Sequence, residues 1–360
     1  MEKMMQEIQE KLANGIRLSR HDGTYLYQQA DLLSLAQMAR QKKLDVSGRH
    51  VFFNVNRHIN LTNICVSRCR FCAFGVDKEG PGAPYLMSIQ EALEYGAAAV
   101  EHGITEFHVV SAMHPDMPLD YYVGVVRTLH DHYPNIHIQA FTAVEIAHMA
   151  KISGLSVGAV LGQLQQAGLG SMPGGGAEIL NDDIRQELCP RKATSQEWLE
   201  VHRIAHQMGI RTNCTMLFGH VETIEDRIDH MLQLRELQDH APGFQAFIPL
   251  PFLPEHTGLQ HLKRTSALDD LKTIAVSRLM LDNIDHIKAF WIMLGLPIAQ
   301  LALDFGADDI DGTVVEERIM HAAGVGTEKG ISKEQLICLI KESGYIPTER
   351  NTLYDILAVY

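Results

Sequence analysis

The chain has few cysteines, few aromatic side chains and no long apolar stretch. Only 6 of its 360 residues are cysteine and 7% are aromatic. No apolar run approaches the ~20 residues that a membrane-spanning helix needs. The first residues, MEKMMQEIQEKLANG, are charged and lack the apolar centre of a signal peptide. We therefore expect a cytoplasmic protein that has no membrane partner.

Basic side chains are also scarce. The chain has 31 Lys and Arg against 44 Asp and Glu, a formal net charge of −13, and it contains no long basic run. A nucleic-acid partner is therefore not expected. In a reducing compartment, six cysteines do not indicate a disulfide framework, and clustered cysteines more often hold a metal or react.

Short runs rich in β-forming residues alternate with helical patterns from about residue 51 onward. The eight runs cover residues 51–62, 106–113, 137–142, 168–175, 211–219, 244–252, 286–294 and 301–310. This alternation predicts an α/β fold, a (β/α)8 TIM-like barrel, with a doubly wound sheet as the alternative. We expect an N-terminal helical extension over 1–50, the barrel over 51–325, and a C-terminal helix and arm over 326–360.

Half of the cysteines lie in one segment, NICVSRCRFCAF, as Cys65-x3-Cys69-x2-Cys72. A structural zinc site is closed by four ligands. A [4Fe–4S] cluster normally takes four cysteines, so three leave one iron open for chemistry. The spacing favours an open iron–sulfur cluster; a zinc site and three unrelated thiols are the alternatives. Cys189, Cys214 and Cys338 are expected to lie apart from this segment and to have no role.

The C-x3-C-x2-C motif after a first strand resembles the radical S-adenosylmethionine (SAM) superfamily, with Phe71 at its usual aromatic position. The resemblance implies that the three cysteines hold a [4Fe–4S] cluster and that SAM binds its open iron. One electron then cleaves SAM to methionine and a 5′-deoxyadenosyl radical. At the second strand end, Ser111 and Ala112 replace the Gly-Gly pair that this superfamily often has against SAM.

Longer motifs resemble the aminofutalosine synthase family. They are FNVNRHINLTNICVSRCRFCAF, MHPDMP, AFTAVEI, GGGAEI, EWLEVHRIAHQMGIRTNCTMLFGHVET and LMLDNIDHIKAFWIMLG. The resemblance implies radical addition to 3-[(1-carboxyvinyl)oxy]benzoate, with rearrangement and decarboxylation, giving 6-amino-6-deoxyfutalosine for menaquinone biosynthesis. SAM would be a consumed co-substrate, and flavodoxin or ferredoxin the electron donor. The alternatives are cyclic dehypoxanthinylfutalosine synthase, an FO-synthase-like enzyme and, from another class, a non-catalytic iron–sulfur or zinc protein.

Residues after the predicted strands are the candidates for SAM binding, because catalytic residues of such barrels lie at the carboxyl ends of strands. In SMPGGGAEIL, Gly174 and Gly175 would let the backbone approach SAM, and Glu178 would accept bonds from its ribose; a tight turn is the alternative. The remaining candidates for SAM binding are Phe71, Ser111, Ala112, Thr142, Glu145 and Ile248, with helix initiation as the alternative for Glu145 and core packing for Ile248.

The candidate catalytic residue is His114, which follows the second strand and has a side chain that titrates near neutral pH. The implied substrate carries two carboxylates, and such anions are usually met by Arg, His or backbone amides. The candidates for these contacts are Arg57, His58, Arg185 and His220.

Overall fold

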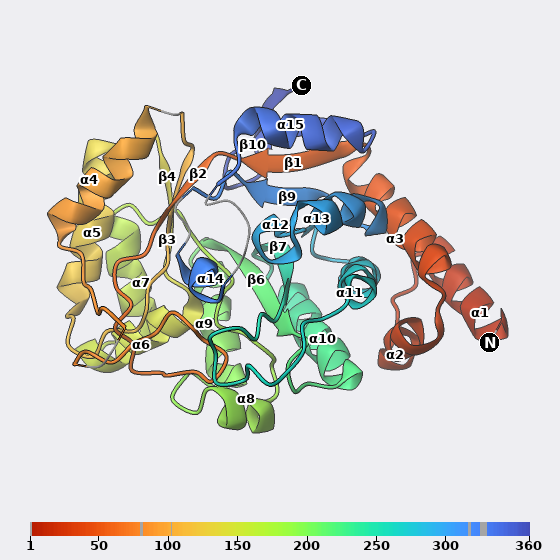
Figure 1. Ribbon diagram of the computed structural model, residues 1–360, viewed down its shortest axis with the longest axis horizontal. Coiled ribbons are helices and arrows are strands. Elements are labelled where there is room, and N and C mark those ends of the chain that lie inside the picture. Colours follow the sequence, from red (N-terminus) through yellow and green to blue (C-terminus); the bar gives the residue numbers. More distant parts are fainter. Residues whose placement is uncertain (1, 80–81, 102, 316–317, 325–329) are drawn as a thin grey trace.

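Seven parallel strands form a curled sheet around the interior of the protein (Figure 1). The computed structural model describes residues 2–79, 82–101, 103–315, 318–324 and 330–360. The sheet runs in chain order through β2 (Asn56–Ile59), β3 (Glu106–Val109), β4 (His137–Ala140), β5 (Ser171–Met172), β6 (Arg211–Phe218), β7 (Phe244–Pro251) and β8 (His286–Ile287). Sequential order is what right-handed β–α crossovers produce, so every strand presents its carboxyl end at the same edge.

Helices between these strands cover the outer face of the sheet (Figure 1). They are α4 (Ile89–Val100), α5 (Leu119–His132), α6 (Ala143–Ser153), α7 (Val157–Gln166), α9 (Ser195–Gln207), α10 (Ile224–His240) and α11 (Ala267–Met280). The short helix α8 (Asp182–Leu188) lies below α9 in this view, beyond the sheet. The polypeptide enters several of them through a capping box, in which a Ser or Thr and an acidic residue three positions later satisfy the first N–H groups. Among the described residues, no single helix is long and apolar enough to cross a membrane. Helices α6 and α7 reach the required length and apolar content only when taken as a pair, and the chain bends by 105° between them.

A second, four-stranded sheet lies beside the first and has the order β11-β10-β1-β9. Its strands are β1 (His50–Asn54), β9 (Asp309–Gly312), β10 (Ile346–Arg350) and β11 (Ile356–Val359). Strand β9 and the residues that follow it also close the barrel. Single parallel bridges join Lys288 to Asp309 in β9 and Arg57 to Val315, three residues after β9 ends. The predicted fold class is therefore confirmed, with seven strands in the continuous ladder and the eighth run at the closure.

Two of the predicted strands differ from the structure. The run 286–294 is a strand only at His286–Ile287 and then forms α12 (Trp291–Leu294). The run 301–310 begins inside α13 (Leu296–Ala302) and the 3-10 helix η1 (Leu303–Phe305) before reaching β9. Each run contains a mainly apolar stretch, AFWIML or LAL, and periodicity alone does not distinguish a buried helix from a buried strand in so short a stretch.

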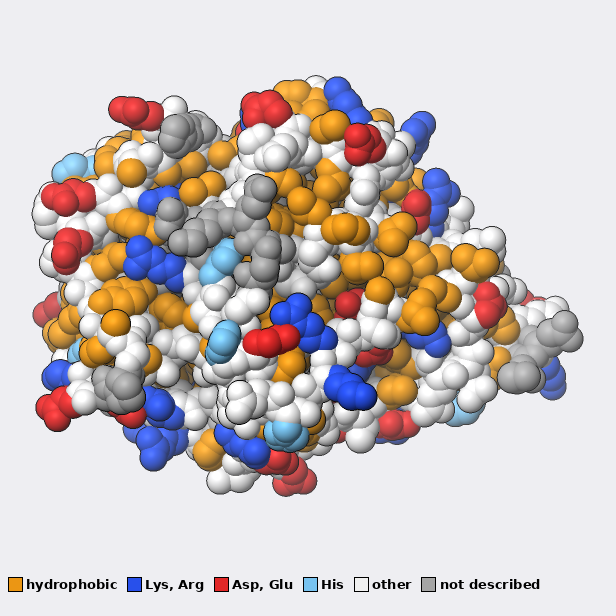
Figure 2. Space-filling view, viewed as in Figure 1, with side chains coloured by type: hydrophobic (Ala, Val, Ile, Leu, Met, Phe, Trp, Pro, Cys, Tyr) orange, Lys and Arg blue, Asp and Glu red, His pale blue; other side chains and the backbone are white. Residues whose placement is uncertain are grey.

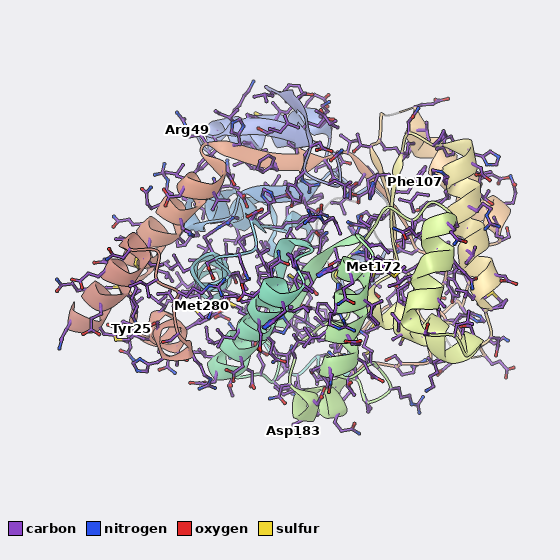
Figure 3. The ribbon with its side chains drawn as sticks, turned by 180° about the vertical axis from the view of Figure 1, so that it is seen from behind. Tyr25, Arg49, Phe107, Met172, Asp183 and Met280 are labelled. Atoms are coloured by element: carbon purple, nitrogen blue, oxygen red, sulfur yellow. The ribbon has the colours of Figure 1, made fainter. Side chains whose placement is uncertain are left out.

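The two ends of the chain pack on the same barrel. Helices α1 (Glu2–Ala13), α2 (Arg20–Gln29) and α3 (Leu32–Ser47) lie beside α10 and α11 at one end of the molecule, as Tyr25 and Met280 mark in Figure 3. Helices α14 (Ile319–Ala322) and α15 (Lys333–Glu342) precede β10. The domain boundaries at residues 50 and 325 stay a prediction.

A buried ion pair joins α11 to the closure of the barrel. Arg278 of α11 donates to Asp308 at 2.6 Å, and the two side chains are 1% and 0% exposed. Asp308 also accepts hydrogen bonds from Ile287 N, His286 Nδ1 and Ser47 Oγ. Burial disfavours the charge of Asp308, but Arg278 and His286 hold its pKa below the usual range.

Replacing Arg278 by Met is expected to lower the free energy of unfolding by about 3–5 kcal/mol, because the buried carboxylate of Asp308 loses its guanidinium partner. The measurement is urea-induced unfolding followed by circular dichroism. The control is Arg203→Met, which removes an exposed pair with Glu200 on α9 and should cost no more than about 0.5 kcal/mol. Equal effects of the two substitutions would contradict the assignment.

Candidate active site

A cavity of about 230 Å³ opens at the carboxyl ends of the strands, between the cysteine segment and the ends of β3, β4, β6 and β7. Most of its lining is apolar. Nine of the residues expected to bind the cluster or SAM line it: Cys65, Cys69, Cys72, Phe71, Ser111, Ala112, Thr142, Gly175 and Glu178. The remaining lining includes Lys192, Thr215, Leu217, Leu250, Phe252 and Met293.

Backbone hydrogen bonds hold the cysteine segment to three parts of the barrel. Val66 N donates to Met113 O at 2.9 Å, after β3. Arg70 N donates to Leu188 O at 2.9 Å, at the end of α8, and Arg70 O accepts from Gly258 N at 2.8 Å. The segment has no regular structure of its own, so these bonds fix the position of the thiols.

The three thiols face one cavity and accept hydrogen bonds from nearby polar groups. Ser67 N donates to Cys65 Sγ and Gly75 N to Cys72 Sγ, both at 3.4 Å, and Ser67 Oγ lies 3.2 Å from Cys69 Sγ. Among the residues with described positions, no three His, Cys, Asp or Glu side chains surround one point closely enough for a single metal ion. Three partly exposed thiols with N–H donors around them fit an iron–sulfur cluster, whose sulfurs are commonly hydrogen-bonded.

The sequence predicts that Cys189 lies apart from the cysteine segment, but in the structure Cys189 contacts that segment. It follows α8 and donates a hydrogen bond to Cys69, which lowers the pKa of Cys69 to about 6. The same bond, together with burial, raises the pKa of Cys189. The approach depends on α8 folding back onto the segment through the Arg70–Leu188 bond, a long-range contact that spacing cannot reveal.

The glycine-rich segment turns Glu178 towards the cavity. Glu178 has a positive φ of 49°, a strained conformation for a residue with a Cβ. Its carboxylate pairs with Lys192 Nζ at 2.5 Å, and both side chains are 12% exposed. Burial disfavours the charge of Lys192, but Glu178 and Cys69 raise the pKa of its ammonium group. Lys192, which also lies 5.3 Å over the ring of Phe71, was missed in the sequence, where its loop has no distinctive motif.

Glu145 links two strand ends beneath the cavity. Its carboxylate accepts from Ser111 N at 2.8 Å and from Thr142 N and Oγ1 at 2.8 and 2.7 Å. Burial raises the pKa of Glu145 to about 7. Glu145 lies in the first turn of α6 and completes its capping box, so the alternative role of helix initiation is confirmed. Its bond to Ser111 also fixes the end of β3, where Ser111 and Ala112 stand in place of the Gly-Gly pair. Ser111 Oγ in turn bonds the backbone of Thr62.

Several other candidates do not line the cavity. His114 is 2% exposed and accepts from Asp116 N through Nδ1. His220 is held by Leu217 O and lies 3.0 Å from Glu222. Ile248 is partly buried on β7. A Cβ on Gly174 would lie 2.6 Å from backbone atoms of Asn213 and Cys214, so this glycine permits close packing against β6.

The candidate substrate-binding residues are dispersed. Arg185 of α8 is 4% exposed and donates to the carbonyls of Gly176, Ala177 and Ala193, which braces the glycine-rich segment. Arg57 and His58 are neighbours on β2, so their side chains lie on opposite faces of the sheet. Arg57 packs over Tyr95 of α4, outside the barrel, whereas His58 stacks on His108 inside.

Surface charge is mixed on the face in Figure 2. Basic and acidic side chains alternate there with hydrophobic ones, and no broad area among the coloured residues carries one sign.

Known families and relatives match nearly the whole chain. Residues 59–234 match the model of the radical SAM superfamily, and residues 241–360 match the CofH/MqnC C-terminal region. The aminodeoxyfutalosine synthase of Streptomyces coelicolor is 42% identical, covering 99% of this chain and 95% of that protein. The enzyme of the same name from Thermus thermophilus is also 42% identical, over 98% and 96%.

A second group of relatives has another name. The 5-amino-6-(D-ribitylamino)uracil–L-tyrosine 4-hydroxyphenyl transferase of Methanopyrus kandleri is 38% identical, covering 92% of this chain and 90% of that protein. Among solved structures, methylornithine synthase has a TM-score of 0.75 at 18% identity, covering 94% and 97%. The hydrogenase maturase HydG has a TM-score of 0.74 at 17% identity, covering 97% and 76%. These structural similarities establish the fold alone.

The parallel barrel, the three thiols at its mouth and the superfamily match define a radical SAM enzyme. Within that superfamily, the chain belongs to the family of the aminodeoxyfutalosine synthases. Membership implies a [4Fe–4S] cluster and SAM, and the donor set at the cavity is compatible with both.

Glu145→Ala is expected to lower the free energy of unfolding by about 2–4 kcal/mol, because the N–H groups of Ser111 and Thr142 lose their buried acceptor. It should also weaken SAM binding, measured by equilibrium dialysis. The matched control is Glu197→Ala, which removes the same capping-box residue from the exposed start of α9. That control should cost about 1 kcal/mol or less and leave SAM binding unchanged.

Proposed function

We propose that this enzyme joins the adenosyl group of SAM to 3-[(1-carboxyvinyl)oxy]benzoate and forms 6-amino-6-deoxyfutalosine. In this reaction the adenosyl carbon bonds to the enol-ether double bond, the aryl group migrates, and the carboxylate leaves as carbon dioxide or, with water, as bicarbonate. The electron that cleaves SAM is released again in the last step, so the overall reaction consumes no reductant. Methionine is the other product. The observation that supports it best is the end-to-end similarity to two aminodeoxyfutalosine synthases, around a cavity that holds three thiols.

Cys65, Cys69 and Cys72 would hold the cluster, which when bound supplies the electron that cleaves SAM. The chain's own part is to place SAM and to keep water from the reacting carbon. Phe71, Leu217, Leu250, Phe252 and Met293 supply apolar walls for this purpose. A flavodoxin or a ferredoxin would supply the electron.

Two charged side chains of the cavity lining, Glu178 and Lys192, would orient SAM. Glu178 offers carboxylate oxygens to the ribose hydroxyls, and Lys192, close to Cys69, offers a positive charge to the carboxylate of SAM. Ser111 and Ala112 would lie against the methionine part, held there by Glu145. His114 remains a proposed catalytic residue that would have to act from beneath the lining.

Lys192→Met should weaken SAM binding about tenfold or more, because a charged partner is lost. Lys192→Arg should retain most of the affinity. The double variant Lys192→Met with Glu178→Gln tests whether the loss is structural, since it leaves no unpaired carboxylate. Binding that returns to the wild-type level in the double variant would contradict a direct role of Lys192, and retained affinity in Lys192→Arg with lost affinity in Lys192→Met supports it. Equilibrium dialysis and thermal unfolding give the two readouts.

Serine at Cys65, Cys69 or Cys72 is expected to lower the iron content of anaerobically reconstituted protein and to abolish SAM cleavage, because Ser is a poor ligand for iron–sulfur clusters. Iron and sulfide assays with visible absorption spectra measure the loss. The controls are Cys338→Ser at the exposed thiol and Cys189→Ala at the thiol beside Cys69. Iron loss in the Cys338 control would contradict the assignment.

Product analysis tests the reaction itself. Reconstituted protein would be given dithionite, SAM and 3-[(1-carboxyvinyl)oxy]benzoate under anaerobic conditions, with products identified by mass spectrometry. An adduct that carries both adenosyl and benzoate groups supports the proposal. Free 5′-deoxyadenosine with unchanged benzoate would overturn this substrate, and the same assay with L-tyrosine and 5-amino-6-(D-ribitylamino)uracil would test the second group of relatives. With dehypoxanthinylfutalosine it would test the cyclic relative.

A further inference from the structure

The interior of the barrel beneath the cavity is polar, although barrels of this type are usually filled by branched apolar side chains. His108 of β3 lies two residues before Val110, which lines the cavity, and side chains two apart on a strand share a face. Asn213 of β6 likewise lies two residues before Thr215, another lining residue. Polar side chains therefore continue inward from the apolar walls.

His108 contacts Glu106 through one ring nitrogen and leaves the other facing the interior. Its Nδ1 lies 3.2 Å from the carboxylate of Glu106, and its ring stacks on His58 with centroids 4.4 Å apart. Burial disfavours the charge of Glu106, but His108 and then Lys288 hold its pKa below the usual range, so Glu106 is a carboxylate and Nδ1 carries the hydrogen. The opposite nitrogen, Nε2, donates to a second carboxylate when both ring nitrogens carry hydrogen. The side chain is 20% exposed, and within the described part of the chain its Nε2 has no hydrogen-bond partner.

Lys288 brings a positive charge into the same layer. It follows β8, and its Nζ donates to Asp311 at 2.8 Å, with the lysine side chain 6% exposed. It lies close enough to His58 and Glu106 to shift their titration. An ammonium group has three donors, and Asp311 uses one of them.

Buried polar atoms in this layer lack partners. His58 Nε2 and Asn213 Oδ1 make no hydrogen bond with the described residues, although both are shielded from solvent. Such atoms are costly unless a bound molecule or water completes them. The layer thus combines the ammonium group of Lys288, the rings of His58 and His108 and unsatisfied polar atoms with the carboxylates of Glu106 and Asp311, below a cavity with apolar walls.

We propose that His108 and Lys288 form a subsite for a carboxylate of the second substrate, with the attached carbon skeleton lying between the apolar walls. His58 supports the ring of His108 from behind, and Glu106 fixes its orientation. The inference rests on the proposed function for the identity of the acid, an aryl carboxylate. It adds to that function the two side chains, His108 and Lys288, that bind the carboxylate of the substrate.

The test is a titration of the reconstituted holoenzyme with sodium 3-hydroxybenzoate and, separately, with 3-hydroxybenzyl alcohol, which lacks the carboxylate. Wild-type protein should bind the acid more tightly than the alcohol. His108→Phe, which retains stacking on His58, and Lys288→Met should each weaken binding of the acid about tenfold or more, and leave the alcohol unchanged. Lys288→Arg should restore most of the affinity for the acid.

The control is Lys272→Met on α11, which removes a partly buried lysine that donates to Tyr27 O outside the barrel. It should change neither titration. SAM binding by His108→Phe and Lys288→Met should equal that of the wild type, which shows that the mouth of the barrel is intact. Equal binding of acid and alcohol by the wild type, or unchanged acid binding by both variants, would overturn the subsite.

These outcomes are separate from those of the product assay. A wild type that binds the acid through His108 and Lys288 but forms no adenosyl adduct would overturn the proposed function and keep the subsite. An enzyme that forms the adduct with unaltered KM for the benzoate substrate in both variants would keep the function and overturn the subsite.

Discussion

Parallel pairing of β2 to β8 is the constraint on which the site depends. Because all seven strands run the same way in chain order, segments far apart in sequence end at one edge. The cysteine segment follows β2, Ser111 follows β3, Thr142 follows β4 and Glu178 follows β5. The sheet therefore brings these four segments together, and the hydrogen bonds among them only fix their exact positions. The bond from Ser111 N to Glu145 is the clearest of these adjustments.

Three of the residues with strained backbone lie in segments that lead to the cavity. Arg68, Phe141 and Glu178 have positive φ values of 50°, 59° and 49°, and each lies in a segment that follows a strand. Such conformations persist only where the surroundings over-determine them. Here the surroundings are the barrel wall and backbone bonds such as that from Leu217 N to Glu178 O. The strain sets the direction in which the thiol segment and the Glu178 carboxylate enter the cavity.

The interior divides into two chemical environments. Near the mouth, apolar side chains and the thiols surround the cavity, an arrangement suited to a reactive carbon that must not meet water. Deeper in the barrel, His58, His108 and Lys288 form a polar layer that is suited to an anion. A substrate with an apolar ring and carboxylates matches that order. The same division would also serve other acids, so the reaction is decided by the assays rather than by the fold.

The sequence by itself determined the class of fold, the thiol motif and the family, since each is written in local patterns: strand and helix periodicity, cysteine spacing and continuous motifs. It did not determine which side chains share a space. Because side chains alternate along a strand, Arg57 lies outside the barrel and His58 inside it. Arg185 donates to backbone carbonyls. Lys192 and Cys189 belong to a loop without a motif, yet both lie at the site. Only tertiary structure decided these, because they depend on contacts between segments that many residues separate.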